Sequence, residues 1–263
     1  MDWIRRFLGG KAKFHAHAEW WIYLPSLPPP EQNQAMAAMM QYRLPTSGKL
    51  APLTPGDGLI FSDVRLHIGL VLREKNPHVF RPDLLLKTVE CSAAQLQALG
   101  LSSAVLVVRY VSDVPFNDPT FLRSLSYLVA TYAKLSGAAL IVDHEAEILW
   151  TTDTFQQALE EDPNATSRDL HVHTDWTPGD GGGTAQTIGM RKLGLPELMT
   201  PFSPSDHRAA IMEVLSLASE HIWNVQSWVP QIDLTAFVDQ YRVTLTPPKN
   251  GQTLCRIMRM NTT

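Results

Sequence analysis

A stretch in the middle of the chain constrains the fold most, because strand and helix signals alternate there at short intervals. Residues 103–111 are apolar and β-branched, as in a buried strand. Asp118-Pro119 is typical of a helix start, and Gly137 is the glycine expected where that helix ends. Two apolar strands and a short helix follow, at about 138–142, 148–151 and 152–160. The predicted order is strand, helix, strand, strand, helix.

The flanking regions mix further strands and helices without a sustained β-α-β-α rhythm. Strands are expected at 14–24, 64–72, 169–176, 184–190, 241–246 and 253–258, and helices at 30–42 and 203–221. Asn250-Gly251 between the last two strands is a strong hairpin signal. This mixture predicts an α+β fold of largely antiparallel sheets with helices packed on one face. Two similar histidine clusters, at residues 15–20 and 171–176, suggest two loosely similar α/β halves.

The length of 263 residues allows one large domain or two modest ones. We expect residues 1–100 to form an N-terminal α/β part of unknown type and residues 101–263 to form an α+β domain. A single continuous domain is the alternative.

Composition and charge exclude several classes of protein. The net charge is −4, which gives no sign of the clustered basic face that nucleic-acid binding normally needs. We therefore expect no nucleic-acid partner. No apolar run approaches the ~18 residues of a membrane span, and the N-terminus lacks the apolar core of a secretory signal. The two cysteines, Cys91 and Cys255, lie far apart and favour reduced thiols in the cytoplasm, with a single disulfide as the alternative.

Residues 1–13 combine four basic side chains with the apolar Trp3, Ile4, Phe7 and Leu8. A short helix of this kind can touch a membrane surface. Packing on its own domain is the favoured interpretation, because two helical turns are only marginally stable alone.

Two histidine pairs are followed at the same spacing by an acid and a tryptophan. The copies are His15-Ala16-His17-Ala18-Glu19-Trp20 and His171-Val172-His173-Thr174-Asp175-Trp176. On a strand, alternate side chains share one face, so each copy would present two imidazoles and a carboxylate together. Such a trio is a common zinc ligand set. A solvated sheet face without metal is the favoured interpretation for both copies, because imidazole is tolerated at exposed and half-buried positions.

The second copy resembles the start of the metallo-β-lactamase signature, His-x-His-x-Asp-His followed by glycines. His171, His173 and Asp175 match it, and Trp176 stands where that family has a third clustered histidine. This resemblance implies a zinc-dependent hydrolase as the alternative function.

Other catalytic patterns are weaker. The glycine-rich run 179–183 lacks the lysine and the following helix of a phosphate loop, so a flexible hairpin loop is favoured. No Gly-x-Ser-x-Gly elbow occurs. Asp143-His144-Glu145 follows a buried strand and permits an acid–base site, although a hairpin turn explains it more simply. No catalytic residue is predicted.

A wider pattern lies between residues 100 and 225. It combines a helix ending in small residues and glycine, a strand ending in Asp143, and the later run Thr187-Ile188-Gly189-Met190 with Gly194-Leu195-Pro196-Glu197-Leu198. The pattern resembles bacterial domains of unknown function that share a Thr-x-Gly-Met…Gly-Leu-Pro-Glu-Leu signature. This resemblance implies a cytoplasmic accessory or immunity-type protein.

These observations favour a non-enzymatic protein that binds another protein and carries no cofactor. Trp176 and Glu197 are the expected contact residues, because tryptophan is a common interface anchor and Glu197 is the one acid in the signature. The alternative is the hydrolase, with zinc held by His171, His173 and Asp175.

Overall fold

The computed structural model describes residues 16–39, 60–61, 64–85, 90–116, 119–234 and 241–259. These residues form helices and two mostly antiparallel sheets, which confirms the α+β class. The predictions for residues 1–13 and for His15 lie outside the described residues. Among the helices that are described, none is both long enough and apolar enough to cross a membrane.

The first sheet has six strands in the order β2-β3-β4-β1-β5-β6. The strands are β1 (Ala16–Leu24), β2 (Ile60–Phe61), β3 (Val64–Leu72), β4 (Ala104–Ser112), β5 (Leu140–Asp143) and β6 (Ile148–Thr151). β1 lies in the middle and pairs antiparallel with both β4 and β5. The sheet therefore spans the boundary that the sequence suggested at residue 100.

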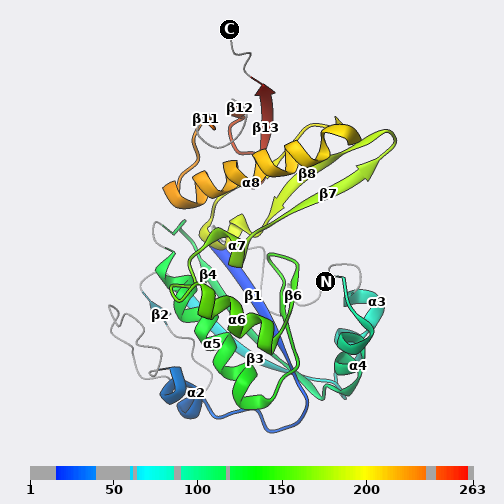
Figure 1. The fold of residues 1–263 in the computed structure, drawn as a ribbon. Helices are drawn as coiled ribbons and strands as arrows, with labels where there is room; N and C mark the ends of the chain where they lie inside the picture. The colour runs from blue at the N-terminus through cyan, green and yellow to red at the C-terminus, as the bar shows by residue number, and fades with distance from the viewer. Residues whose placement is uncertain are drawn as a thin grey trace.

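Helices cover both faces of this sheet, whereas the sequence suggested one. α2 (Gln32–Met39), α5 (Thr120–Ser136) and α6 (Thr152–Glu161) cover the first face, and the 3-10 helix η2 (Pro77–Phe80), α3 (Pro82–Leu85) and α4 (Ala93–Leu101) lie towards the second (Figure 1). The reason is visible in β1, where Trp20 and Trp21 point to opposite faces and both are buried. Because successive side chains alternate, a strand that is apolar throughout needs cover on both sides.

The second sheet is built from the later part of the chain in the order β10-β8-β9-β13-β12-β11, with β7 paired to β8. Its strands are β7 (His173–Gly179), β8 (Gly182–Ile188), β9 (Glu197–Met199), β10 (Ser203–Pro204), β11 (Gln231–Asp233), β12 (Tyr241–Leu245) and β13 (Gln252–Arg259). The long helix α8 (Arg208–Val225) packs on β7, β8 and β13. In Figure 1, α8 and the β7–β8 hairpin lie above the first sheet.

One hydrophobic core joins the two sheets. It runs from Trp20 in β1 and Leu122 in α5 to Trp223 in α8 and Val243 in β12. Between the sheets lie α7 (Arg168–His171), the 3-10 helix η3 (Met190–Leu193) and the start of β7.

The predicted strand–helix–strand–strand–helix order is confirmed by β4, α5, β5, β6 and α6. Gly137 ends α5 with a left-handed φ of 64°. The hairpin at Asn250-Gly251 is also confirmed, with positive φ at both residues. These features depend on local capping and turn geometry, which act over a few residues.

Two predicted elements were wrong in part. The strand expected over 169–176 begins only at His173, because residues 168–171 form α7. The helix expected from 203 begins at Arg208, because Ser203 and Pro204 pair with Gly183 and Gly182 as β10. In both places a tertiary contact overrides the local signal. Helix α4 was not expected at all, although Ser92 caps it through a capping box with Gln95.

The glycine-rich run is a packed hairpin and not only a flexible loop. Gly181 occupies the turn with a φ of 73° and has open space where a side chain would begin. Gly183 differs, because a Cβ there would lie 2.5 Å from the carbonyl oxygen of Thr177 and 2.6 Å from the indole of Trp176. The run therefore allows the close approach of β7 and its tryptophan to β8.

We expect Gly183→Ala to lower the free energy of unfolding by about 3 kcal/mol, because the methyl group overpacks a buried contact. The matched substitution Gly181→Ala meets no atom and should cost only about 1 kcal/mol, from its left-handed backbone. Urea unfolding of both variants measures the difference. Equal losses would mean that the contact with Trp176 does not constrain the hairpin.

Candidate functional site

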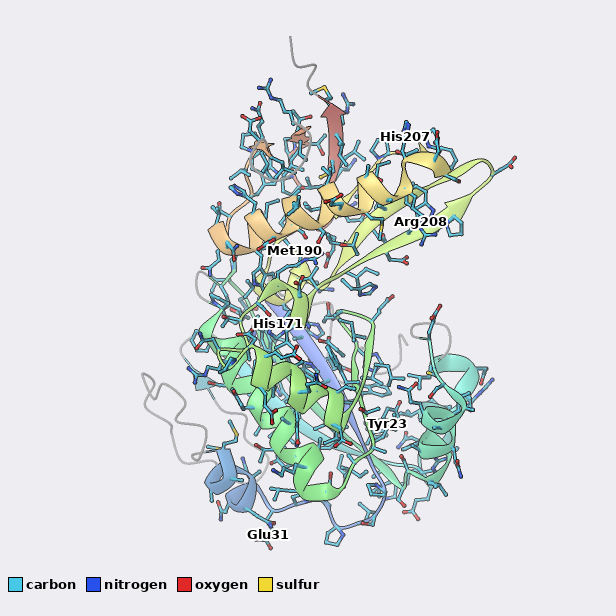
Figure 2. The ribbon with its side chains drawn as sticks, in the orientation of Figure 1. Tyr23, Glu31, His171, Met190, His207 and Arg208 are labelled. Atoms are coloured by element: carbon cyan, nitrogen blue, oxygen red, sulfur yellow. The ribbon has the colours of Figure 1, made fainter. Side chains whose placement is uncertain are left out.

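Lys192 is the most unusual side chain at the junction of the two sheets, because it is a lysine with no exposed surface. Its ammonium forms an ion pair with the carboxylate of Asp143 at the end of β5, and it donates to the carbonyl of His171 at 3.0 Å. The nitrogen also lies 5.3 Å from the ring centroid of Trp20, within cation–π range. Burial lowers the pKa of Lys192, and the Asp143 carboxylate opposes this effect. Figure 2 shows the neighbouring His171 and Met190 between the two sheets.

The backbone around Lys192 is held from the first sheet. The hydroxyl of Tyr110 in β4 donates to the carbonyl of Lys192, and the amide of Phe116 donates to the carbonyl of Leu193 at 3.0 Å. Gly189 and Gly194 flank η3 with φ values of 118° and 76°, so both ends require a left-handed backbone. The segment from Gly189 to Gly194 therefore joins the two sheets.

Glu197 is held inside the same segment. One carboxylate oxygen accepts a hydrogen bond from Thr187 at 2.8 Å, and the other accepts from the amides of Gly189 at 2.9 Å and Arg191 at 3.3 Å. Burial raises the pKa of Glu197 to about 7, and these hydrogen bonds act in the opposite direction. Glu197 was expected to contact a partner, but both of its oxygens are engaged within the chain.

The three predicted zinc ligands do not share one face. His171 ends α7, and its ring stacks on Trp223 with centroids 5.8 Å apart. Its Nε2 lies 2.8 Å from the carbonyl of Ala165, so Nε2 carries the proton and donates. Burial lowers the pKa of His171 to about 3, which keeps the ring neutral. Only His173 and Asp175 follow the alternation of a strand, and the Nδ1 of His173 is buried without a partner among the described residues.

The first histidine cluster is engaged within the first sheet. His17 bonds Glu145 in the turn between β5 and β6, and Glu19 accepts a hydrogen bond from the indole of Trp21 at 2.6 Å. Burial would raise the pKa of Glu145, but the hydrogen bond and charge of His17 lower it overall. Within the described ranges, no group of three or more histidine, cysteine, aspartate or glutamate side chains is arranged to hold a metal.

Trp176 is packed and not presented to solvent. It is 8% exposed and lies against Gly183, while the guanidinium of Arg208 lies 5.9 Å from its ring centroid. Its size and its place next to a turn indicated an interface anchor. Its observed contacts are those of a core side chain that seats the β7–β8 hairpin on α8.

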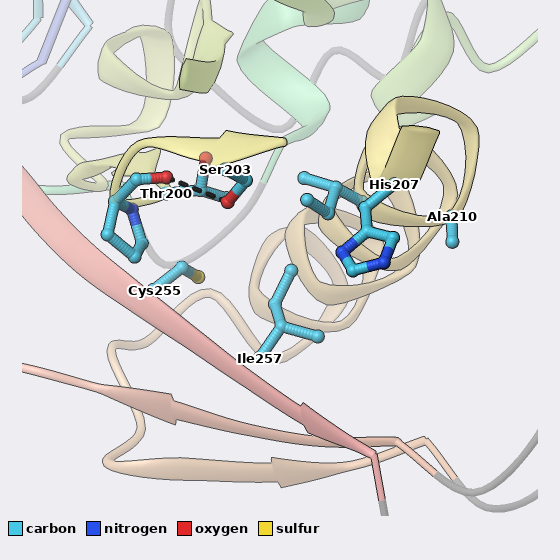
Figure 3. Close-up of a pocket in the computed structure, with 8 residues that line it drawn as sticks. Thr200, Ser203, His207, Ala210, Cys255 and Ile257 are labelled. Carbon is cyan, nitrogen blue, oxygen red and sulfur yellow. Dashed lines mark hydrogen bonds between the residues drawn. The ribbon is translucent and has the colours of Figure 1, made fainter. Parts of the chain in front are cut away.

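A pocket of about 390 Å³ opens in the second sheet, between the β9–β10 segment, β13 and the first turn of α8 (Figure 3). Its walls include Thr200, Ser203, His207, Ala210, Cys255 and Ile257. Phe202, between two lining residues in the sequence, is 58% exposed and rests against Gly179 and Gly182. A cavity of this volume falls in the range of binding sites in proteins.

The pocket offers little to catalysis. Burial raises the pKa of the Cys255 thiol to about 12, so the thiol stays protonated at neutral pH and is a poor nucleophile. None of the eight lining residues is an acid, and His207 is largely exposed to solvent at its rim.

Sequence reasoning missed both Lys192 and the pocket. Nothing local in the sequence indicated that Lys192 is buried, because the adjacent Arg191 lies between the same two glycines and is exposed. Pro201, which follows β9 after Thr200, was a usable sign only that a main-chain donor is missing at this position, since no strand was expected at 197–199.

No protein-family model, curated protein or solved structure matches this chain.

We expect Lys192→Met to lower the free energy of unfolding by about 3–5 kcal/mol, because it leaves the Asp143 carboxylate buried without its cation. Adding Asp143→Asn should recover about half of the loss, since asparagine is neutral and keeps the oxygen that accepts from the amides of Glu145 and Ala146. Urea unfolding at neutral pH measures both. Equal stability of the single and double variants would contradict a stabilising ion pair.

Glu197 makes the stability depend on pH. Its pKa is about 7 in the folded chain and 4.5 ordinarily, so the folded state keeps a proton that the unfolded state has lost between these values. The stabilisation that comes from the proton kept on Glu197 is therefore complete below about pH 4.5 and is lost as the pH rises through about 7.

Glu197→Gln imitates the protonated acid and should remove this dependence. Relative to the variant, the original chain should lose roughly 2 kcal/mol between about pH 5 and pH 8. Urea unfolding of both proteins across this interval provides the measurement, and the histidines cancel because both proteins contain them. Parallel pH profiles would show that Glu197 titrates normally.

Proposed function

We propose that this protein acts by binding another protein, as a cytoplasmic accessory or immunity-type protein of bacteria, and that it binds through the face around the pocket. The observation that carries the proposal is Phe202, an aromatic side chain that is 58% exposed and lies in the sequence between Pro201 and Ser203, two residues that line the cavity. Aromatic side chains are enriched at protein interfaces and often anchor them.

The chemistry of the face supports contact with a protein. Ala210, Ile211 and Ile257 give the pocket an apolar floor, while Ser203 and His207 supply polar groups at its rim. An apolar centre with a polar border is the usual anatomy of an interface. The resemblance of the Gly-Leu-Pro-Glu-Leu signature to bacterial domains supports the accessory role, and the net charge of −4 does not favour nucleic acid.

One observation keeps the hydrolase as the second candidate. The Nδ1 of His173 is buried without a partner among the described residues, and Asp175 follows it on the same face of β7. A zinc site there would need His171 to leave the contact with Trp223 and rotate towards β7.

The test of protein binding uses the full chain as bait in a bacterial lysate, followed by affinity measurement with the purified partner. Phe202→Asp should weaken binding by about tenfold or more, because it removes an interface anchor. Leu101→Asp is the matched control, since Leu101 is 70% exposed but lies at the end of α4. A partner retained equally by both variants would contradict the proposed face.

The same preparation distinguishes the two candidate functions. Elemental analysis should find no stoichiometric zinc, manganese or iron in the purified chain. A stoichiometric metal that is lost in the variant His171→Ala/His173→Ala would overturn the binding proposal and support the hydrolase.

A further inference from the structure

The pocket is a gap within the second sheet. β9 and β13 run parallel for three residue pairs, from Glu197 with Gln252 to Met199 with Leu254. Beyond this point β13 continues beside β12, while the segment that follows β9 stays beside β8 and forms β10. The two strands therefore separate, and the cavity opens between them with α8 as its floor (Figure 3).

Pro201 explains why the pairing stops. The amide of Thr200 donates to the carbonyl of Ala185 in β8, so the next residue must face β13. In a continued ladder, the amide of residue 201 would donate to the carbonyl of Cys255. Proline has no N–H, and the carbonyl of Pro201 instead accepts the hydroxyl of Ser203 at 3.0 Å.

The same alternation identifies which groups of β13 face the gap. The carbonyl of Leu254 accepts from the amide of Thr246 on the β12 side, and Arg256 pairs with Thr244 on that side. The carbonyl of Cys255 and both main-chain groups of Ile257 therefore point away from β12. Among the described residues no strand pairs with them there. An edge of this kind is a template for another strand.

The side chains around the gap suit an extended segment with alternating chemistry. Cys255 and Ile257 point towards α8, where Ala210 and Ile211 complete an apolar floor. Arg256 lies between them in the sequence, so its exposed side chain is on the opposite face of β13. A neighbouring strand would place apolar side chains inward and an acidic side chain next to Arg256.

We propose that an extended segment of the partner protein inserts between β10 and β13 as an additional strand of the second sheet. The segment hydrogen-bonds to the carbonyl of Cys255 and to both main-chain groups of Ile257, directs apolar side chains at Ala210 and Ile211, and carries an acid beside Arg256. This mode of binding rests on the proposed function, and it is β-strand addition at an unpaired edge.

The test uses a random library of displayed peptides as the probe and the full chain as the target. Selected peptides should alternate apolar and acidic residues. Ala210→Trp fills the floor of the gap and should weaken their binding by about tenfold or more, because the inward side chain loses its space. Ala209→Trp is the matched control, since Ala209 is exposed on the same helical turn and does not line the pocket.

Two further measurements do not depend on how a variant folds. Binding should slow hydrogen exchange of the Ile257 amide by about tenfold or more, while the amides of Arg256 and Met258, already paired with β12, should change little. Methylating alternate amide nitrogens of the peptide on the β13 side should abolish binding.

Peptides that bind Ala210→Trp as well as the original chain, or leave Ile257 unprotected, would overturn strand insertion. So would a library that yields no binder. Each of these results leaves the proposed function standing if Phe202→Asp still releases a protein partner, so the two proposals fail separately.

Discussion

The arrangement of the two sheets depends on the interactions of the buried ammonium of Lys192. The ammonium meets the carboxylate of Asp143 from β5, the carbonyl of His171 from α7 and the ring of Trp20 from β1. Removing a lysine and an aspartate from water costs several kcal/mol per ion, so the pair is tolerated only when every partner is in place. The ion pair therefore forms in only one placement of η3 against the first sheet. Other placements would leave a buried charge without its partner and would be less stable.

The course of the second sheet follows from that placement. Glu197 is tied to Gly189 and Thr187 directly after η3, and β9 begins at this residue. β9 can run beside β13 only until Pro201, which has no amide hydrogen to donate. The cavity, and the edge of β13 that no described strand covers, thus arise from one anchored segment and one proline. A cavity formed by the sheet itself is held by the same contacts that hold the fold.

The histidine clusters show that spacing in the sequence does not establish which side chains meet in the fold. Equal spacing placed two imidazoles and an acid on one face, provided that each segment was a strand throughout. In the second copy the strand begins at His173, and His171 turns into the core against Trp223. In the first copy His17 meets Glu145, which lies 128 residues away in the sequence. Spacing cannot indicate such partners, because they come from other parts of the chain.

The sequence by itself determined the α+β class, the order of β4, α5, β5, β6 and α6, the end of α5 at Gly137, and the turn at Asn250-Gly251. Caps, glycines and periodicity act over a few neighbouring residues, so these features can be read locally. Only the tertiary structure decided that β1 lies between β4 and β5, that Lys192 is buried, that Trp176 and Glu197 are engaged within the chain, and that the second sheet divides at Pro201. Those outcomes depend on desolvation and hydrogen bonding between residues far apart in the sequence, and such contacts exist only once the chain has folded.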